Sequence, residues 1–407
     1  MSEYIPRIID SRLDAALKES VSVRLVGMKG VGKTRTALEK AGSSFPFGRR
    51  RGRLKTPDPT SVFSGKSPVL IDECPAVPGV QDTMEDGIKA AGETGRYILT
   101  SSMCSPVSSI NGCPVIRMST MSLYETGDSS GEVSVSSLFE NAPVHGNLRN
   151  ITLAEIMHYI VRGGWPDNLN ASDSSRMPRY YIERFLRRDL EEKNGYIDRK
   201  KFRRVMRVLA ENTGTVCSVG KLRRDTKSRN NPAGIDEDTI SGYLDVLSDF
   251  HLIHEEKAFS PDFRTTQRFK TGVRRHFEDT SLACAVIGAD EKNLVDDLEL
   301  LEHMFESLVT HDLRIYMESL GGYVSHYRSY PNDEVDAVLT LDDGRFGFVE
   351  IKLGWEEVID RAAANLLRIS SKLEEKPSFL AVVSGMSSIP YRREDGVYVL
   401  PLTSLRP

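Results

Sequence analysis

The chain has 407 residues, which is too long for one hydrophobic core, so two or three domains are expected. Its 39% hydrophobic and 28% charged residues are typical of a soluble globular protein, and the net charge of −4 excludes a globally basic nucleic-acid-binding protein. The five cysteines lack C-x-x-C spacing, which argues against a zinc ribbon and suits a reducing cytoplasm. Without an apolar signal core or an apolar run that could cross a bilayer, we expect a cytoplasmic protein with no membrane contact.

The first strong motif is a phosphate-binding loop. Apolar spacing predicts a helix at residues 8–20 and a buried strand at 21–26. The residues that follow match the pattern G-x-x-x-x-G-K-S/T: Gly27-Met28-Lys29-Gly30-Val31-Gly32-Lys33-Thr34. Glycines let such a backbone wrap a polyphosphate, and the N–H groups at the start of the next helix, expected at residues 34–40, point at it. We therefore expect Lys33 to reach the β- and γ-phosphates and the Thr34 hydroxyl to bind Mg²⁺.

The second strong motif is an apolar strand that ends in two acids, as in a Walker B segment. It has the sequence Val69-Leu70-Ile71-Asp72-Glu73. Placed after a phosphate loop, this pattern predicts that Asp72 holds the Mg²⁺ shell and that Glu73 orients and activates the attacking water. Between the two motifs, residues 49–55 form a dense basic run that could contact phosphates, although a solvated loop is the more common explanation.

Further apolar segments extend the α/β pattern. A helix is expected at residues 84–91 and strands at 95–102 and 115–118. Strands that alternate with helices predict a parallel sheet that is covered on both faces.

The order of the short motifs is itself specific. It runs Tyr-x-x-Arg at residues 4–7, the phosphate loop, Leu-Ile-Asp-Glu, Tyr-Ile-Leu-Thr-Ser-Ser, Met-Ser-Leu-Tyr-Glu, Ser-Leu-Phe at 137–139 and Gly-Gly-Trp-Pro at 163–166. Over nearly the whole chain, this order resembles that of the large bacterial and archaeal family of AAA-like P-loop ATPases that carry a C-terminal domain of unknown function.

The resemblance implies an ATPase that uses ATP and Mg²⁺. It also implies that Thr100, Ser101 or Ser102 senses the γ-phosphate, with ordinary strand-end turn chemistry as the alternative for these hydroxyls. The sequence has no Asn/Thr-Lys-x-Asp guanine-reading motif, which favours ATP over GTP.

The sequence departs from the family pattern before the last strand of the sheet. There the family usually has an arginine after a glycine, whereas Gly112 is followed here by Cys113, so Arg117 has to replace a candidate finger or sensor arginine. The predicted catalytic residues are Lys33, Asp72, Glu73 and Arg117. The predicted cofactor-binding residues are Gly27, Gly30, Val31, Gly32, Lys33, Thr34, Arg35 and Ser101, with Thr34 and Asp72 as the metal ligands.

A helical region with concentrated positive charge follows. Helices are expected at residues 180–190, 202–212, 219–225 and 238–250, the last one capped by Asp238, and a strand is expected at 252–259. Three helices followed by a hairpin form the outline of a winged helix. Residues 184–229 contain 15 Lys and Arg against 6 Asp and Glu, so they could contact a phosphate backbone, with protein contact under solvated charges as the alternative. Because acids crowd the 238–250 helix, DNA contact would be directed at the backbone.

The last region carries acids in a nuclease-like pattern. Helices are expected at residues 300–308, 314–320 and 362–373, and strands at 323–328, 334–341, 345–352, 379–383 and 397–400. Glu350 and Lys352 share one face of a strand, Asp336 lies on the strand before it, and Glu306 approaches from a helix. The set resembles the PD-(D/E)xK nuclease arrangement, in which two carboxylates bind Mg²⁺ and the lysine orients or deprotonates water. An ion-pair cluster in an inert domain is the alternative.

Together these patterns predict an α/β protein with three domains. They are a P-loop AAA-type ATPase domain at residues 1–165, a helical and winged-helix domain at 166–285 and an α+β restriction-endonuclease-like domain at 286–407. We expect an Mg²⁺-dependent ATPase whose nucleotide state controls the C-terminal half. A nucleotide-dependent protein-interaction switch and an ATP-regulated nuclease stay open as alternatives. The expected partners are ATP, DNA through the basic region, and a second copy of the chain or another protein.

Overall fold

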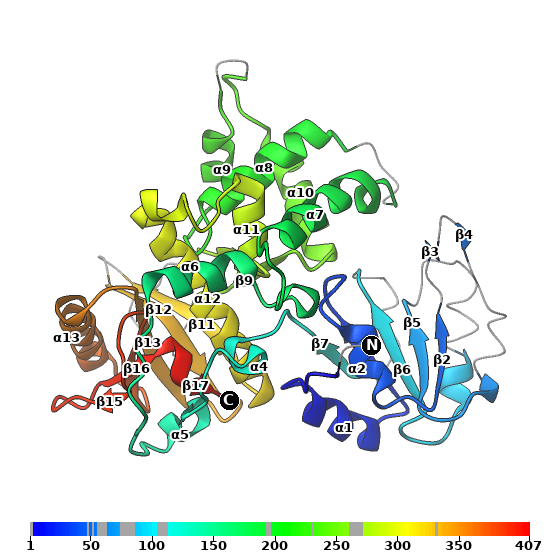
Figure 1. Ribbon diagram of the computed structural model, residues 1–407, viewed down its shortest axis with the longest axis horizontal. Coiled ribbons are helices and arrows are strands. Elements are labelled where there is room, and N and C mark those ends of the chain that lie inside the picture. Colours follow the sequence, from blue (N-terminus) through cyan, green and yellow to red (C-terminus); the bar gives the residue numbers. More distant parts are fainter. Residues whose placement is uncertain are drawn as a thin grey trace. The chain divides into compact units, whose positions relative to one another are not determined.

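The computed structural model describes residues 3–46, 49–50, 53–54, 63–73, 86–103, 113–192, 197–228, 231–259, 272–329 and 333–407. Parts of the basic run at 49–55 and of the helix expected at 84–91, together with Gly112, lie outside these residues. The chain divides into two compact units (Figure 1). The first comprises Met1–Met121 with Val246–Leu252, and the second comprises Ser122–Asp245 with Ile253–Pro407. Within the described ranges, no helix combines the length and the apolar character needed to span a membrane.

The first unit is built on a parallel sheet of five strands. Their bounds are β1 (Ser22–Val26), β2 (Ser43–Pro46), β5 (Val69–Asp72), β6 (Tyr97–Ser101) and β7 (Val115–Arg117). The strand order is β2-β5-β6-β1-β7, and every neighbouring pair is parallel. Both β1 and β6 are buried along their whole length, since they lie in the middle of a sheet that is covered on both faces. The predicted parallel α/β sheet is confirmed.

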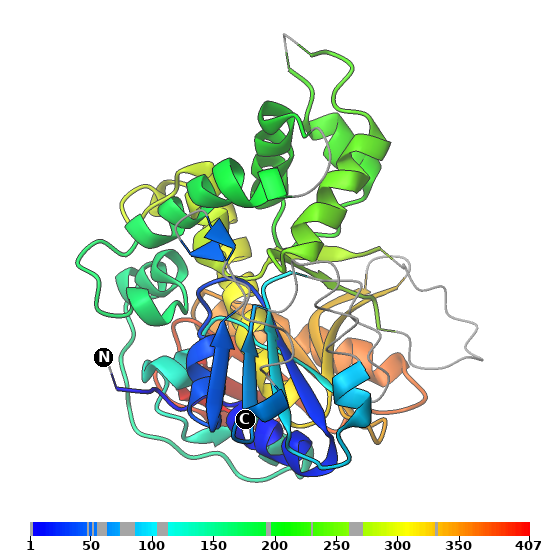
Figure 2. The same ribbon diagram turned by 90° about the vertical axis from the view of Figure 1, so that its right-hand side faces the viewer.

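Helices and loops cover the two faces of this sheet (Figure 2). On one face, α1 (Asp10–Glu19) and α2 (Lys33–Leu38) pack Leu13, Leu17 and Ala37 onto the apolar side chains of the strands. On the other face, Ile88 and Phe63 pack against Tyr97 and its neighbours. A short antiparallel pair, β3 (Arg49–Arg50) and β4 (Arg53–Leu54), lies within the basic run.

The second unit begins with helices. Their bounds are α4 (Leu123–Thr126), α5 (Val135–Phe139), α6 (Leu153–Arg162), α7 (Arg176–Arg184), α8 (Arg199–Glu211), α9 (Val219–Asp225), α10 (Glu237–Asp249) and α11 (Thr280–Ile287). The end of α10, from Val246 onward, belongs to the first unit. Helix α11 is apolar and packs against α6, α7 and α8. Strands β9 (Ile253–Glu256) and β10 (Arg274–Phe277) pair antiparallel after α10. The predicted cap of α10 was wrong: Asp236, not Asp238, accepts a hydrogen bond from the Thr239 N–H at 2.8 Å.

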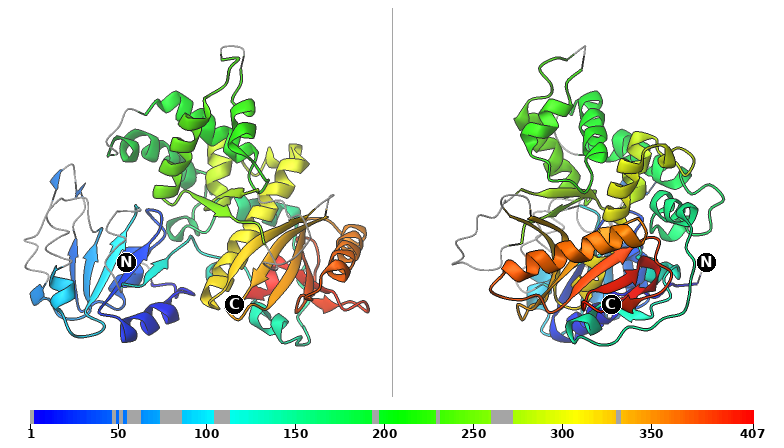
Figure 3. Two further views of the ribbon diagram at one scale, coloured as in Figure 1. Left: turned by 180° about the vertical axis from the view of Figure 1, so that it is seen from behind. Right: turned by 90° about the vertical axis from the view of Figure 1, so that its left-hand side faces the viewer.

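A mixed sheet of six strands completes the second unit. The bounds are α12 (Leu298–Ser319), β11 (Tyr323–Ser329), β12 (Asp333–Thr340), β13 (Phe346–Lys352), α13 (Glu356–Lys372), β14 (Leu380–Ser384), β15 (Tyr391–Arg392) and β16 (Tyr398–Pro401). The order is β11-β12-β13-β14-β16-β15, with antiparallel pairs from β11 to β13 and parallel pairs from β13 to β16. Helices α12 and α13 lie on opposite sides of this sheet (Figure 3).

Two details of the second unit differ from or extend the sequence analysis. The helices expected at 300–308 and 314–320 form the single helix α12, because residues 309–313 contain no helix-breaking residue and are all buried. The C-terminal strand β17 (Leu405–Arg406) pairs in parallel with β8 (Val133–Ser134). Residues 122–165 thus belong to the second compact unit, and the division into three domains stays a prediction.

Candidate functional site

The phosphate loop leaves β1 and enters α2 in the order that the sequence predicts. Gly30 and Gly32 have φ angles of 88° and 105°, which glycine adopts without strain. Gly27 has a φ of 152°, and a Cβ atom there would lie only 2.1 Å from the carbonyl oxygen of Met118. A side chain at position 27 would therefore displace the loop from the end of β7.

Lys33 is buried within the loop. Its ammonium group donates hydrogen bonds to the carbonyl oxygens of Gly27 (2.8 Å) and Met28 (2.7 Å) and to the Ser102 hydroxyl (3.1 Å). Burial lowers the pKa of Lys33 to about 8, although the nearby Glu73 and Asp72 carboxylates act in the opposite direction. The loop thus holds a buried cation whose hydrogen-bond acceptors are neutral oxygens. A phosphate oxygen could take the place of these acceptors.

The Asp72 carboxylate at the end of β5 accepts two hydroxyl hydrogen bonds. The Thr34 hydroxyl donates to Oδ1 at 2.6 Å, and the Thr100 hydroxyl donates to the same atom at 2.7 Å. Thr100 reaches Asp72 because β6 lies between β5 and β1 in the sheet. A hydroxyl and a carboxylate at this distance are the oxygen ligands that Mg²⁺ takes beside phosphate oxygens and water.

Glu73 follows Asp72 in a backbone conformation that is rare for a residue with a side chain. Its φ is 55°, and its N–H donates to the Thr100 hydroxyl at 2.9 Å. The side-chain carboxylate accepts a hydrogen bond from the Ser102 hydroxyl. Because of this turn, the two consecutive acids accept hydrogen bonds from different residues. Asp72 accepts from Thr34, and Glu73 accepts from Ser102.

The three strand-end hydroxyls separate into two groups. Thr100 and Ser102 contact the acids, whereas Ser101, the predicted cofactor-binding residue, donates to the Met103 carbonyl oxygen at 2.6 Å. Alternation along a strand accounts for this difference, because successive side chains point to opposite faces.

The other residues predicted for this site lie around the loop. Arg35 pairs with Glu39 at 2.9 Å, and its guanidinium carbon lies 5.8 Å from the centre of the Tyr4 ring. Arg117 ends β7 and is in register with Val26, directly before the loop. Cys113 packs against the apolar cluster on one face of the sheet, where burial raises the pKa of its thiol.

Arg7 is a loop contact to which the sequence analysis gave no role. Its guanidinium donates to the carbonyl oxygen of Val31 at 2.8 Å and to that of Ser119 at 2.9 Å. The available signal was the Tyr-x-x-Arg motif at residues 4–7, whose spacing alone does not identify a partner.

The four residues of the predicted nuclease-like site also gather, at the sheet of the second unit. The Lys352 ammonium group contacts Asp336 Oδ2 at 2.7 Å and Glu350 Oε2 at 2.8 Å. Burial would raise the pKa of Asp336, but Lys352 and Arg274 hold it below its ordinary value. Burial and the neighbouring Asp336 carboxylate raise the pKa values of Glu306 and Glu350.

Arg274 of β10 is a second cation in this cluster, and the sequence analysis missed it. The side chain is 3% exposed, and its Nη1 donates to Glu306 Oε1 at 2.7 Å and to the Asp336 carbonyl oxygen at 2.9 Å. Its Nη2 contacts Glu334 at 2.5 Å. Across the described ranges, no three His, Cys, Asp or Glu side chains are arranged to hold a metal ion. Instead, Lys352 contacts Asp336 and Glu350, and Arg274 contacts Glu306.

The basic region lies on α8 and α9. Some of its arginines pair with acids at the surface, as in Arg203 with Glu183 and Arg207 with Glu211, both at 2.9 Å. Lys200, Lys201 and Arg224 are exposed. Exposed ion pairs of this kind contribute little to stability.

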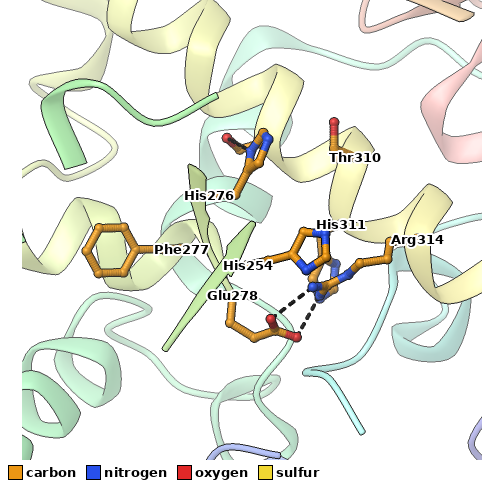
Figure 4. A pocket seen from close by; sticks show the side chains of 8 residues that line it. His254, His276, Phe277, Glu278, Thr310, His311 and Arg314 are labelled. Carbon is orange, nitrogen blue, oxygen red and sulfur yellow. Dashed lines mark hydrogen bonds and ion pairs between the residues drawn. The ribbon is translucent and has the colours of Figure 1, made fainter. Parts of the chain in front are cut away.

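A small pocket lies between the β9–β10 pair and α12 (Figure 4). The pocket contains a buried ion pair in which Arg314 donates to both Glu278 carboxylate oxygens, at 2.6 and 2.9 Å. On the other side, the Ser307 hydroxyl lies 2.8 Å from His276 Nδ1. The side chains are thus already engaged with one another.

Two family models match parts of the chain. One is described as "Domain of unknown function (DUF8612)" and matches residues 153–293, and the other is described as "Domain of unknown function (DUF4143)" and matches residues 301–405. A C-terminal domain of unknown function, which the sequence resemblance implied, is therefore present. A search of the curated proteins gives no match.

Several solved structures are distantly similar. A Walker-type ATPase of Pyrococcus abyssi is 13% identical with a TM-score of 0.44, over 70% of this chain and 96% of that one. The ORC2 protein of Aeropyrum pernix, in ADPNP–ADP complexes, is 13% identical with a TM-score of 0.30, over 72% and 90%. The ORC1 protein of the same organism, in complex with DNA, is 12% identical with a TM-score of 0.22, over 70% and 94%. At these values, function has to be argued from the residues of this chain.

Proposed function

We propose that this protein is an Mg²⁺-dependent ATP-binding protein and ATPase whose nucleotide state controls its C-terminal half. One observation carries the proposal: the Lys33 ammonium group, the Thr34 hydroxyl and the acids Asp72 and Glu73 at the end of β5 meet at the carboxyl ends of adjacent strands. Ligands of parallel α/β sheets bind at this edge.

The residues fit a magnesium–nucleotide. Gly30 and Gly32 give the loop the backbone that can wrap phosphates, and Lys33 supplies a positive charge beside it. Thr34 and Asp72 offer hard oxygen ligands for Mg²⁺, which neutralises charge on the phosphates when it is bound. Glu73, held by Ser102, orients the attacking water and accepts its proton. Arg117 at the end of β7 is the proposed finger or sensor.

The test is ATP hydrolysis by the wild type, Lys33→Ala and Glu73→Gln, with ATP affinity measured beside it. We expect Lys33→Ala to lose binding. Glu73→Gln should keep binding and lose hydrolysis by about 100-fold or more, as for removal of a general base. Normal turnover in both variants would rule out this assignment.

We propose a nuclease-like fold for the C-terminal half on the element order α12-β11-β12-β13-α13-β14 and on the contacts of Lys352 with Asp336 and Glu350. Arg274 favours the second candidate function, a nucleotide-dependent protein-interaction switch with an inert nuclease-like domain. Its guanidinium already bonds Glu306, so a metal ion that used this carboxylate would have to displace the arginine. An ATP-regulated nuclease is the remaining candidate.

Cleavage of supercoiled plasmid and single-stranded DNA distinguishes these candidates. Wild type and Asp336→Ala are incubated with Mg²⁺ or Mn²⁺, with and without ATP. Cutting by the wild type alone would assign a nuclease. If neither protein cuts, while ATP hydrolysis is normal, the switch is favoured.

DNA contact through α8 and α9, of the proposed winged helix, belongs to the same proposal. It rests on the exposed cations Lys200, Lys201 and Arg224. The acids at the start of α10, Glu237 and Asp238, favour contacts to the DNA backbone over base contacts. Self-association of the ATPase domain would need an arginine presented to a neighbouring nucleotide, for which Arg117 is the candidate.

A further inference from the structure

Arg7 connects the phosphate loop to the end of the parallel sheet. Its side chain is 7% exposed, and its two terminal nitrogens donate to different segments, Val31 in the loop and Ser119 after β7. Its backbone is held in turn, because the Arg7 N–H donates to Asp10 Oδ2 at 2.9 Å and the Tyr4 hydroxyl donates to Asp10 Oδ1 at 2.7 Å. Both ends of the connection are therefore fixed.

The loop needs such a donor for a physical reason. A loop that turns its N–H groups toward a phosphate turns carbonyl groups away from it, and a buried carbonyl without a donor is costly. Lys33 serves the carbonyls of Gly27 and Met28, whereas Arg7 serves that of Val31. A nucleotide that draws Lys33 toward its phosphates leaves Arg7 as the cation on the loop backbone.

The segment after β7 touches the loop at a second point. Met118 donates its N–H to the Val26 carbonyl oxygen at 2.7 Å, and its own carbonyl leaves no room for a side chain on Gly27. Residues 118–119 are thus connected to the loop at two points. Met118 contacts Gly27 directly, and Ser119 is linked to Val31 through Arg7.

The same segment leads directly into the second unit. That unit begins at Ser122, three residues after Ser119. Ser122 caps α4 through a reciprocal pair of hydrogen bonds with Glu125. The Leu123 N–H at the start of α4 donates to Asp312 Oδ2 at 2.9 Å, and Asp312 belongs to α12, the helix that also carries Glu306.

From these contacts we infer that Arg7 is a positioning residue that transmits nucleotide occupancy of the loop to residues 118–126, and so to the start of the second unit. The inference rests on the proposed ATP binding and adds the route by which that binding is passed on. It differs from a purely structural role because the loop and residues 118–126 should respond together to the nucleotide, and this shared response should depend on the guanidinium group.

Amide hydrogen exchange of the full chain tests the inference in two arms. The first arm compares nucleotide-free wild type with Arg7→Met, Arg7→Lys and Asp14→Ala. Asp14 is the control because its pair with Lys40, at 2.7 Å, also ties α1 to the α2 side of the sheet but contacts neither segment. The second arm repeats the comparison with Mg²⁺ and saturating ADPNP, and the affinity for ADPNP is measured for each variant.

We expect Arg7→Met to raise exchange at least threefold both in residues 27–34 and in 118–126, and to weaken ADPNP binding roughly tenfold, as for loss of one charge-assisted hydrogen bond. At saturating ADPNP, the wild type and Asp14→Ala should gain protection at 118–126, Arg7→Lys should gain part of it, and Arg7→Met, which keeps only the contact at Gly27, should gain the least.

Two results would overturn the inference: protection of 118–126 by ADPNP in Arg7→Met equal to that in the wild type, or faster exchange confined to the loop. If the wild type binds no ADPNP, the proposed function fails, and the first arm alone decides whether Arg7 joins the two segments. If Arg7→Met does not fold, the partial response of Arg7→Lys decides in its place, and a full wild-type response in that variant counts against the inference.

Discussion

The charge of Lys33 depends on its surroundings in the phosphate loop. Its ammonium group is buried and bonds two carbonyl oxygens of its own loop, so the energetic cost of keeping it charged is only partly offset. A phosphate group would supply the missing negative charge. The state of Lys33 is therefore coupled to nucleotide binding.

This coupling predicts a pH dependence of ATP binding. Burial lowers the pKa of Lys33 to about 8, so the free protein loses this cation as the pH rises above 8. We expect ATP affinity to fall between pH 7 and pH 9, with uptake of close to one proton per ATP at pH 9 and almost none at pH 7. Calorimetry in buffers of different ionisation enthalpy measures the uptake. Lys33→Arg, whose charge is constant in this range, is the control, and equal proton uptake at both pH values would contradict the prediction.

Thr100 predicts a difference between binding and hydrolysis. Its hydroxyl bonds both Asp72 Oδ1 and the Glu73 N–H, and so orients the two acids. Thr100→Val keeps the shape and removes both bonds, so we expect hydrolysis to drop about 10- to 100-fold while ATP affinity changes little. Steady-state kinetics with separate affinity measurements provide the test. Ser43→Ala on the edge strand β2, where the hydroxyl bonds the Lys66 carbonyl, should behave like the wild type.

At the scale of elements, ion pairs with buried arginines connect the β9–β10 pair to the C-terminal sheet and α12. Arg274 of β10 reaches Glu306 on α12 and Glu334 on β12, and Arg314 of α12 pairs with Glu278 just after β10. Buried pairs of this kind give specificity of packing more readily than net stability, because removing water from each charge is costly.

Loss of one partner should therefore be severe. Arg274→Met leaves the Glu306 carboxyl group and the Asp336 carbonyl oxygen buried without this donor, and we expect about 3–5 kcal/mol of lost unfolding free energy in the second unit. Both tryptophans, Trp165 and Trp355, lie in that unit, so their fluorescence during urea unfolding reports it. The exposed Arg345, paired with Asp343, is the control, and Arg345→Met should stay within about 0.5 kcal/mol of the wild type. A similar small cost for Arg274→Met would contradict this account.

The contact between β12 and α13 should make stability fall in acid. Burial would raise the pKa of Asp333, but hydrogen bonds from Lys372 and Arg368 lower it below its ordinary value. The charged pair therefore stabilises the fold above the unfolded pKa of about 3.9 and loses this effect as the pH falls below it. We expect Asp333→Asn to lose at most about 1 kcal/mol at pH 6, since both cations are half exposed, and the difference from wild type to shrink by pH 3. Urea unfolding at the two pH values measures this stability difference. A difference that is larger at pH 3 than at pH 6 would refute the prediction.

At the scale of the whole molecule, the net charge of −4 hides an uneven distribution. The second unit presents exposed cations on α8 and α9 beside an acidic α10. A polyanion would be attracted to the first two helices and repelled by the third.

DNA binding, if it occurs on α8 and α9, should follow salt accordingly. Replacing Lys200, Lys201 and Arg224 by Ala should weaken binding equally for different sequences. It should also lower the slope of log affinity against log salt by up to about 3, as for three lost phosphate contacts. Fluorescence anisotropy over a salt series measures the slope. Lys292→Ala, which removes an exposed cation outside these helices, is the control. An unchanged slope in the triple variant would rule out α8 and α9 as the DNA-binding surface.

Local pattern was enough to predict much of the fold. The strand–loop–helix at residues 22–38, the acidic end of β5 and the hairpin of β12 and β13 depend on neighbours in the chain, and each lies close to its predicted position. The same holds for α9, whose bounds match the prediction. The two halves of α12 were the exception, because its buried middle could not be assigned to a helix before its packing was known.

The sequence alone determined which chemical groups the chain carries, since Lys33, Asp72, Glu350 and Lys352 belong to motifs of short span. Only the tertiary structure decided which groups meet. Arg7 and Ser119 are 112 positions apart, and Arg274 and Asp336 are 62 apart, so no local spacing could pair them. The alternation at the end of β6, with Ser102 at Glu73 and Ser101 turned away, was likewise fixed only by the sheet. Short-range patterns specify elements, whereas hydrogen bonds between distant residues arise from how those elements pack.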